Sequence, residues 1–195
     1  MKKLELSDIR NIYEYEKVRE EMRRRVIDLK RRRRVQVGQH LCFVFENRET
    51  VLFQIQEMCR VERIVDEAKV QEEVKVYNDL IPGDNELSAT LMIEIEEASA
   101  IQPVLDRLMG IDAGEHVWIQ VGKDYAVPAQ FEPGRSDEER GKISAVHFVR
   151  FAFPPEAIKA FREQDVYLVV DHPGEMARTR IPEEVRASLL EDVQP

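Results

Sequence analysis

The sequence predicts a single domain of the α+β class, in which a mostly antiparallel sheet of about six strands is covered by long N-terminal helices. Three observations lead to this prediction. The chain has 195 residues, which suits one domain of ordinary size. Apolar residues alternate without a gap from Leu87 to Ile95, and this is the period of a strand. Strands do not alternate regularly with helices of crossover length, so a doubly wound parallel sheet fits poorly.

The first third of the chain is predicted to be mainly helical. Ser7 and Asp8 offer a helix cap, and no Pro or Gly follows before Gly38. Beyond Gly38, the alternation of Leu41 and Phe43 marks the start of a strand. Apolar residues recur in this stretch at intervals that indicate a long, partly amphipathic helix. The elements predicted here are a helix over 9–33, a strand over 37–46, and helices over 50–66 and 68–77.

The rest of the chain is predicted to contain most of the strands. Gly122-Lys123-Asp124 is a turn sequence between two apolar segments, which indicates a hairpin. Residues 132–141 are polar and turn-forming, and we expect a mobile surface loop there. The predicted elements are strands over 87–95, 116–121, 125–131, 143–153 and 166–170, and helices over 103–108, 154–161 and 182–190.

Charge is divided unevenly along the chain. Residues 1–34 hold 13 Lys or Arg against 7 Asp or Glu, a net of +6, and the remainder holds 16 against 31, a net of −15, which together give the overall −9. Opposite charges on one chain attract, so we expect the basic N-terminal helix to pack on the acidic body of its own chain or of a second copy in a homodimer.

The basic charge is concentrated at the end of the predicted first helix. Eight Lys or Arg residues stand within twelve positions, with Asp28 as the single acid. Such density can form an ion-paired surface, bind a protein partner or bind a polyanion. Nucleic acid is disfavoured, because interleaved aromatic residues are absent and the body of net charge −15 would repel phosphate. The candidate residues are Arg23, Arg24, Arg25, Lys30, Arg31, Arg32, Arg33 and Arg34.

The helix predicted over 50–66 carries a carboxylate on its apolar side. Its apolar residues fill one continuous arc, with Glu62 near the centre and Gln54 at the edge. A carboxylate that faces a core costs several kcal/mol unless it is paired or protonated. Either Glu62 has a structural partner, such as Arg150 or an arginine of the first helix, or it is a functional carboxylate.

A pocket around Glu62 is the sequence's main hypothesis for chemistry. The four histidines show no metal-binding spacing, but His147 and Glu94 stand on strong strands from which they could converge with Glu62. The cysteines, Cys42 and Cys59, form no CxxC or Cys/His group, so no cofactor is evident. The candidate ligand-binding residues are Glu57, Glu62, Asn78, Glu94 and His147.

Several segments of the central third resemble a bacterial and archaeal family known as domain of unknown function 3501. These segments are 45–51, 54–58, 60–62, 77–82 and 86–91. The resemblance extends over nearly the whole chain and transfers no catalytic residue. Genes of this family often stand beside those for rubrerythrin and an iron–sulfur oxidoreductase, which implies a role around redox or peroxide chemistry. Because the chain lacks cysteine and histidine ligand patterns, the implied role is that of an accessory protein for a metalloprotein.

Two functions from different classes follow. The leading hypothesis is an interaction or accessory protein, which we expect in the cytoplasm because the chain has no apolar run long enough for a membrane span and no apolar signal core behind Lys2 and Lys3. The alternative is an enzyme or a small-ligand or metal-binding protein with its pocket around Glu62.

Overall fold

The computed structural model describes residues 1–137 and 140–193, and it confirms an α+β domain with mostly antiparallel sheets. In this part of the chain, no helix has both the length and the apolar character needed to cross a bilayer. The α-helices are α1 (Ile12–Arg31), α2 (Arg48–Val61), α3 (Glu67–Tyr77), α4 (Ile101–Arg107), α5 (Pro155–Glu163) and α6 (Glu183–Leu190), and the short 3-10 helices are η1 (Leu6–Asp8), η2 (Asn78–Leu80) and η3 (Ala98–Ala100).

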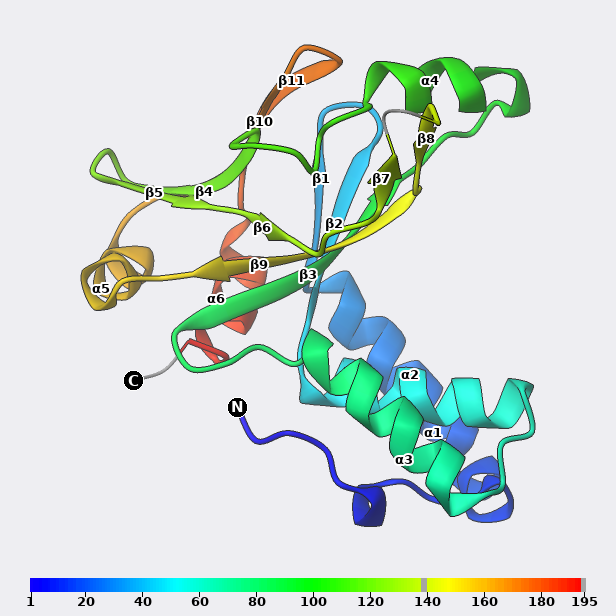
Figure 1. The fold of residues 1–195 in the computed structure, drawn as a ribbon. Coiled ribbons are helices and arrows are strands. Elements are labelled where there is room, and N and C mark those ends of the chain that lie inside the picture. The colour runs from blue at the N-terminus through cyan, green and yellow to red at the C-terminus, as the bar shows by residue number, and fades with distance from the viewer. Residues whose placement is uncertain (138–139, 194–195) are drawn as a thin grey trace.

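The predicted sheet is divided into two larger sheets and one small pair of strands (Figure 1). The strands are β1 (Arg34–Val37), β2 (Leu41–Glu46), β3 (Glu86–Ile93), β4 (Val117–Val121), β5 (Tyr125–Pro128), β6 (Gln130–Phe131), β7 (Ser136–Asp137), β8 (Lys142–Ile143), β9 (Val146–Ala152), β10 (Val166–His172) and β11 (Glu175–Arg180). The first sheet has the order β1-β2-β3-β9-β6, the second has the order β11-β10-β4-β5, and β7 pairs with β8.

One apolar core joins the two larger sheets. Phe43 and Phe45 of β2 and Leu91 of β3 belong to it, together with Ile119 of β4 and Leu168 of β10, and all five side chains are fully buried. Alternate residues of a strand face opposite sides of a sheet. The remaining residues of β2, which include Glu46, therefore lie on the outer face of the first sheet. They are also buried, because the N-terminal helices lie over that face.

The turn between β1 and β2 ties the first sheet to the second. Gly38 adopts a φ of 65°, a conformation that favours glycine, and a Cβ at this position would collide with the carboxylate of Glu175. That carboxylate accepts hydrogen bonds from the backbone N–H groups of Gln39 and His40, and it lies 3.0 Å from Nδ1 of His40. The start of β11 therefore holds the β1–β2 hairpin in place.

The helices α1, α2 and α3 lie together at one end of the molecule (Figure 1). The helices α2 and α3 share a separate small core, to which α2 contributes Val51, Ile55 and Cys59 and α3 contributes Val74. The N-cap of α2 is Asn47, whose side chain accepts hydrogen bonds from the backbone N–H groups of the first turn. This unit carries the N-terminal segment of the chain on its surface.

The helix α2 is shorter than predicted, and this changes the position of Glu62. The helix ends at Val61, Glu62 is its C-cap, and Arg63 has a φ of 55° that turns the chain away. The predicted apolar arc therefore breaks off, so that Val65 is 76% exposed and Glu62 is exposed as well. The expectation that Glu62 faces the core is wrong, and the need for a buried partner disappears with it.

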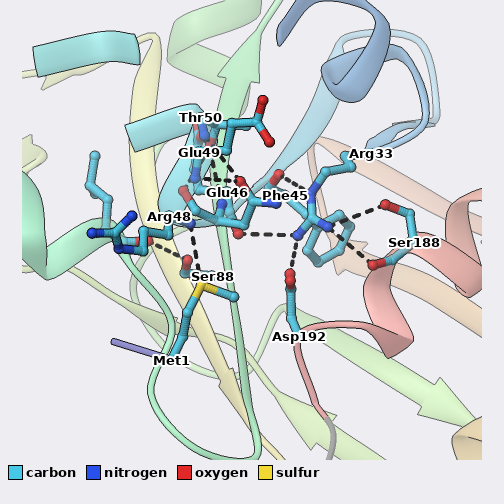
Figure 2. A network of polar contacts seen from close by, with 12 residues as sticks. Met1, Arg33, Phe45, Glu46, Arg48, Glu49, Thr50, Ser88, Ser188 and Asp192 are labelled. Carbon is cyan, nitrogen blue, oxygen red and sulfur yellow. Dashed lines mark hydrogen bonds and ion pairs between the residues drawn. The ribbon is translucent and has the colours of Figure 1, made fainter. Parts of the chain in front are cut away.

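Arg33 is fully buried and joins the start of β1 to the end of β2 and to the region of α6 (Figure 2). Its Nε donates to the carbonyl of Phe45, and its Nη1 donates to the carbonyl and hydroxyl oxygens of Ser188. Its Nη2 donates to the carbonyl of Glu46 and to the carboxylate of Asp192. Because Arg33 lies inside the protein, it does not belong to the exposed basic surface that the sequence predicts.

Two further elements differ from the prediction for physical reasons. The strand β11 was not predicted, because its sequence has no apolar alternation. Its outward side chains are exposed, and that of Met176 is 75% exposed. Beyond Pro128 the chain leaves the second sheet and pairs as β6 with β9 of the first. Part of the loop expected over 132–141 forms β7, and its residues 138–139 lie outside the described residues.

The Arg33 network gives the first prediction. Replacing Arg33 with Met is expected to lower the free energy of unfolding by roughly 3–5 kcal/mol, because Asp192 then remains buried without its partner. The double variant with Asp192→Asn should lose less than the two single variants added together. Urea unfolding measures these losses. Arg24→Met, at an exposed position of α1, is the control and should change stability by less than about 0.5 kcal/mol.

Candidate functional site

The five residues predicted to form a pocket lie at separate places. Glu57, on α2, accepts hydrogen bonds from the Tyr15 hydroxyl at 2.6 Å, from Arg19 at 2.8 and 3.0 Å, and from Arg60 at 3.2 Å. The hydrogen bond from Arg19 is the main reason that the pKa of Glu57 falls to about 2. Its partners Tyr15 and Arg19 on α1 show that this carboxylate joins α1 to α2, whereas Glu62 is the exposed C-cap of α2.

Glu94 and His147 lie on opposite faces of the first sheet. Glu94 accepts two hydrogen bonds from Arg34, at 2.6 and 2.8 Å, on the outer face. His147 pairs in register with Leu91, faces the core and is fully buried, and its Nδ1 is 3.6 Å from the carboxylate of Asp112. Burial lowers the pKa of His147. Across the described ranges 1–137 and 140–193, no group of three or more His, Cys, Asp or Glu side chains could hold a metal ion.

The basic residues are divided among several contacts. Arg31 and Arg32 both pair with Asp28 one helical turn away, and Arg25 pairs with Glu49 of α2. Arg23 and Arg24 are exposed on α1, whereas Lys30, Arg31 and Arg34 border a hollow at the outer face of the first sheet. Of the eight side chains, Arg33 is buried, and the other seven are at least partly exposed on α1, at its C-cap or at the start of β1.

Two amide side chains fasten the N-terminal segment to the helices. Asn78 accepts from the backbone N–H of Leu4 at 2.8 Å and donates to its carbonyl at 2.9 Å. Gln56, which is 2% exposed, accepts from the backbone N–H of Arg10 at 2.8 Å and donates to its carbonyl at 3.0 Å. Residues 5–9 bridge these two clamps and lie beside α2 and α3.

A groove of about 850 Å³ opens between this N-terminal segment and the link from α2 to α3. We call it the N-terminal groove. Its lining is mainly apolar, and Tyr13 and Val65, two of the lining residues, are 82% and 76% exposed. The side chains that matter here are Leu6, Ile9, Tyr13, Cys59, Ile64 and Val65.

The charged residues of the N-terminal groove are mixed, with an excess of acid. Glu5 and Glu67 line it, Asp66 caps the adjacent helix, and Arg10 is the basic residue of the lining. Large apolar side chains that stay in water beside such a hollow are typical of a surface that binds another protein.

Comparison with known proteins gives the family. Residues 3–193 match a family model described as a protein of unknown function (DUF3501). The chain belongs to the DUF3501 family. This DUF3501 chain is also similar to the crystal structure of a novel protein of unknown function from Burkholderia pseudomallei K96243. The two are 33% identical, with a TM-score of 0.90 over 99% of this chain and 100% of that chain. No curated protein matches the DUF3501 chain.

The N-terminal groove was not predicted from the sequence of the DUF3501 chain. The helix predicted over 50–66 includes Val65 in its apolar arc, and the exposure of Val65 follows from the left-handed turn at Arg63. Arg63 is not one of the residue types that usually mark such a turn, so this helix end carries no strong signal. Tyr13 could have been found, because it falls outside the apolar positions of its own helix.

The contacts of Glu57 give a pH-dependent prediction. Glu57→Gln is expected to lower the free energy of unfolding by about 1–3 kcal/mol near neutral pH, because the charge-assisted hydrogen bonds from Arg19 and Arg60 weaken. The folded-state pKa of about 2 lies below the ordinary 4.5. The extra stability of the wild-type protein over Glu57→Gln is therefore fully present above about pH 4.5. It is lost as the pH falls toward about 2.

Urea unfolding of both proteins at neutral pH and at about pH 3 measures this dependence. Glu62→Gln, at the exposed C-cap, is the matched control and should behave like the wild type at both values. A difference between wild type and Glu57→Gln that stays the same at both pH values would contradict the assignment.

Proposed function

We propose that this DUF3501 chain is an interaction protein that binds a segment of a partner protein in the N-terminal groove. The observation that carries the proposal is the pair of exposed side chains, Tyr13 and Val65, at the edge of an apolar groove of about 850 Å³. Covering these side chains would remove apolar area from water, which is the main favourable contribution to protein association.

The chemistry of the groove indicates what kind of segment it accepts. Apolar side chains of the partner would contact Tyr13, Ile64 and Val65, and a Lys or Arg beside them would face Glu5 and Glu67. The groove is preformed, because the clamps at Leu4 and Arg10 hold its N-terminal wall. Binding would then require little ordering of this chain.

The family resemblance supplies the partners to test. Genes of this family often stand beside those for rubrerythrin and an iron–sulfur oxidoreductase, so we propose one of these two metalloproteins, in the cytoplasm, as the owner of the segment. The role of this chain would be that of an accessory protein in redox or peroxide chemistry. The alternative pocket around Glu62 has little support, since its five residues lie apart.

Titration calorimetry with the purified rubrerythrin and oxidoreductase of the same organism tests the proposal. Tyr13→Asp and Val65→Asp, alone and together, should each weaken binding about tenfold or more, because a carboxylate would be buried against apolar atoms of the partner. Met176→Asp is the matched control, since Met176 is 75% exposed but lies on β11.

Three outcomes would contradict the proposal. The first is that neither metalloprotein binds. The second is that the two groove variants bind like the wild type. The third is that Met176→Asp weakens binding as much as the groove variants do. Sedimentation of the wild type and of Val65→Asp is run in parallel. A dimer that dissociates in the variant would show that a second copy of the chain occupies the groove instead.

A further inference from the structure

We infer that a second hollow, between the C-terminal turns of α1 and the outer face of the first sheet, binds a small organic acid that also carries a hydroxyl or amino group. We call it the outer-face hollow. Its volume is about 580 Å³, within the range of small-molecule sites. The side chains that define it are Lys30, Arg31, Arg34, Val44, Glu46 and Met92.

The basic side chains of the outer-face hollow are available to an acid. Arg31 pairs with Asp28 and Arg34 pairs with Glu94, but these are pairs between largely exposed groups, which add little stability. Nζ of Lys30 is 3.9 Å from the carboxylate of Glu46, beyond hydrogen-bond distance. A carboxylate or phosphate could therefore bind these cations at the expense of weak contacts only.

Glu46 places an acceptor at the inner end of the outer-face hollow. The residue is 2% exposed, and its carboxylate accepts one hydrogen bond from the Thr90 hydroxyl at 2.8 Å. It accepts another from the Thr50 hydroxyl at 2.5 Å (Figure 2). Each carboxylate oxygen can accept two hydrogen bonds, so capacity remains. A buried carboxylate held by two hydroxyl groups and a distant ammonium is incompletely compensated. A ligand that donates a hydrogen bond would complete it.

Gln54 provides an independent indication of a bound donor. It lines the same hollow from α2, and its side-chain oxygen is buried without a hydrogen-bond partner among the described residues. Buried polar atoms are normally hydrogen-bonded in folded proteins. Together with Glu46, this atom indicates that a hydroxyl or amino group of a ligand belongs at the inner end of the hollow.

The spacing of these groups limits the class of ligand. The ammonium of Lys30 and the carboxylate of Glu46 are neighbours, so the acid group and the donor of the ligand must also be neighbours, as they are in 2-hydroxy and 2-amino acids. The walls between them are apolar, since Val44 is buried and Met92 and Ile27 border the opening. A branched or linear apolar side chain of the ligand would lie against them.

Titration calorimetry with four compounds that share one branched apolar side chain tests this inference. The compounds are 2-hydroxy-4-methylpentanoate, leucine, 4-methylpentanoate, which lacks the donor, and isoamylamine, which lacks the acid. At least one of the first two should bind about tenfold more tightly than either of the last two, because each of those loses a charge-assisted contact. Failure of both complete compounds to bind at millimolar concentration would overturn the inference.

Three variants identify the side chains responsible. Lys30→Met, at a partly exposed position, should weaken the binding of every acid about tenfold. Glu46→Gln should weaken the compounds with a donor and leave 4-methylpentanoate unchanged. Arg24→Gln, on the same helix but outside the hollow, is the control and should bind like the wild type. Binding by Lys30→Met that equals the wild type would place the ligand elsewhere and refute the site.

Discussion

The buried guanidinium of Arg33 is the contact on which the arrangement of the elements depends. A guanidinium has five N–H donors, and the five hydrogen bonds of Arg33 use all of them. They join the junction of α1 and β1 to the end of β2 and to α6, segments far apart in the sequence. Lysine could not replace it, since an ammonium has three donors and no planar fork. The carbonyl of Glu46 is among the groups so fixed, at the end of the strand whose alternation places the side chain of Glu46 on the outer face of the first sheet.

A second constraint uses side-chain amides in place of backbone pairing. Gln56 and Asn78 each donate to a carbonyl and accept from an N–H of the same residue, Arg10 and Leu4 respectively, as a neighbouring strand would. A buried backbone group without a partner is unfavourable, so these amides let an irregular segment lie against the helices. The N-terminal groove exists because the segment between the clamps is held without filling the space beside it.

The sequence predicted elements whose side chains alternate in polarity and missed those whose pairing depends on distant contacts. The strand predicted over 87–95 appears as β3, because one of its faces lies in the main core. Among the described residues, the strand β11 pairs with β10 alone, and it shows no apolar face, so periodicity could not reveal it. The division into two sheets depends on the crossing of the chain after Pro128, which no local pattern encodes. Glu62 was misplaced because a helix boundary, the least certain part of a periodicity argument, moved by a few residues.

The candidate sites were harder to predict for a related reason. Glu46 could have been suspected, because Cys42 and Val44 precede it at alternate positions of one strand and are apolar, which indicates that the outer face of that strand is buried too. The basic residues could not be assigned from their density. The helix α1 ends at Arg31 and an alternating strand begins at Arg34, so neighbouring side chains point in different directions. The basic residues, which look alike in the sequence, therefore have three different roles. Arg33 makes buried hydrogen bonds, others form ion pairs on the surface of α1, and others border the outer-face hollow. Each role follows from the direction of the backbone at that residue.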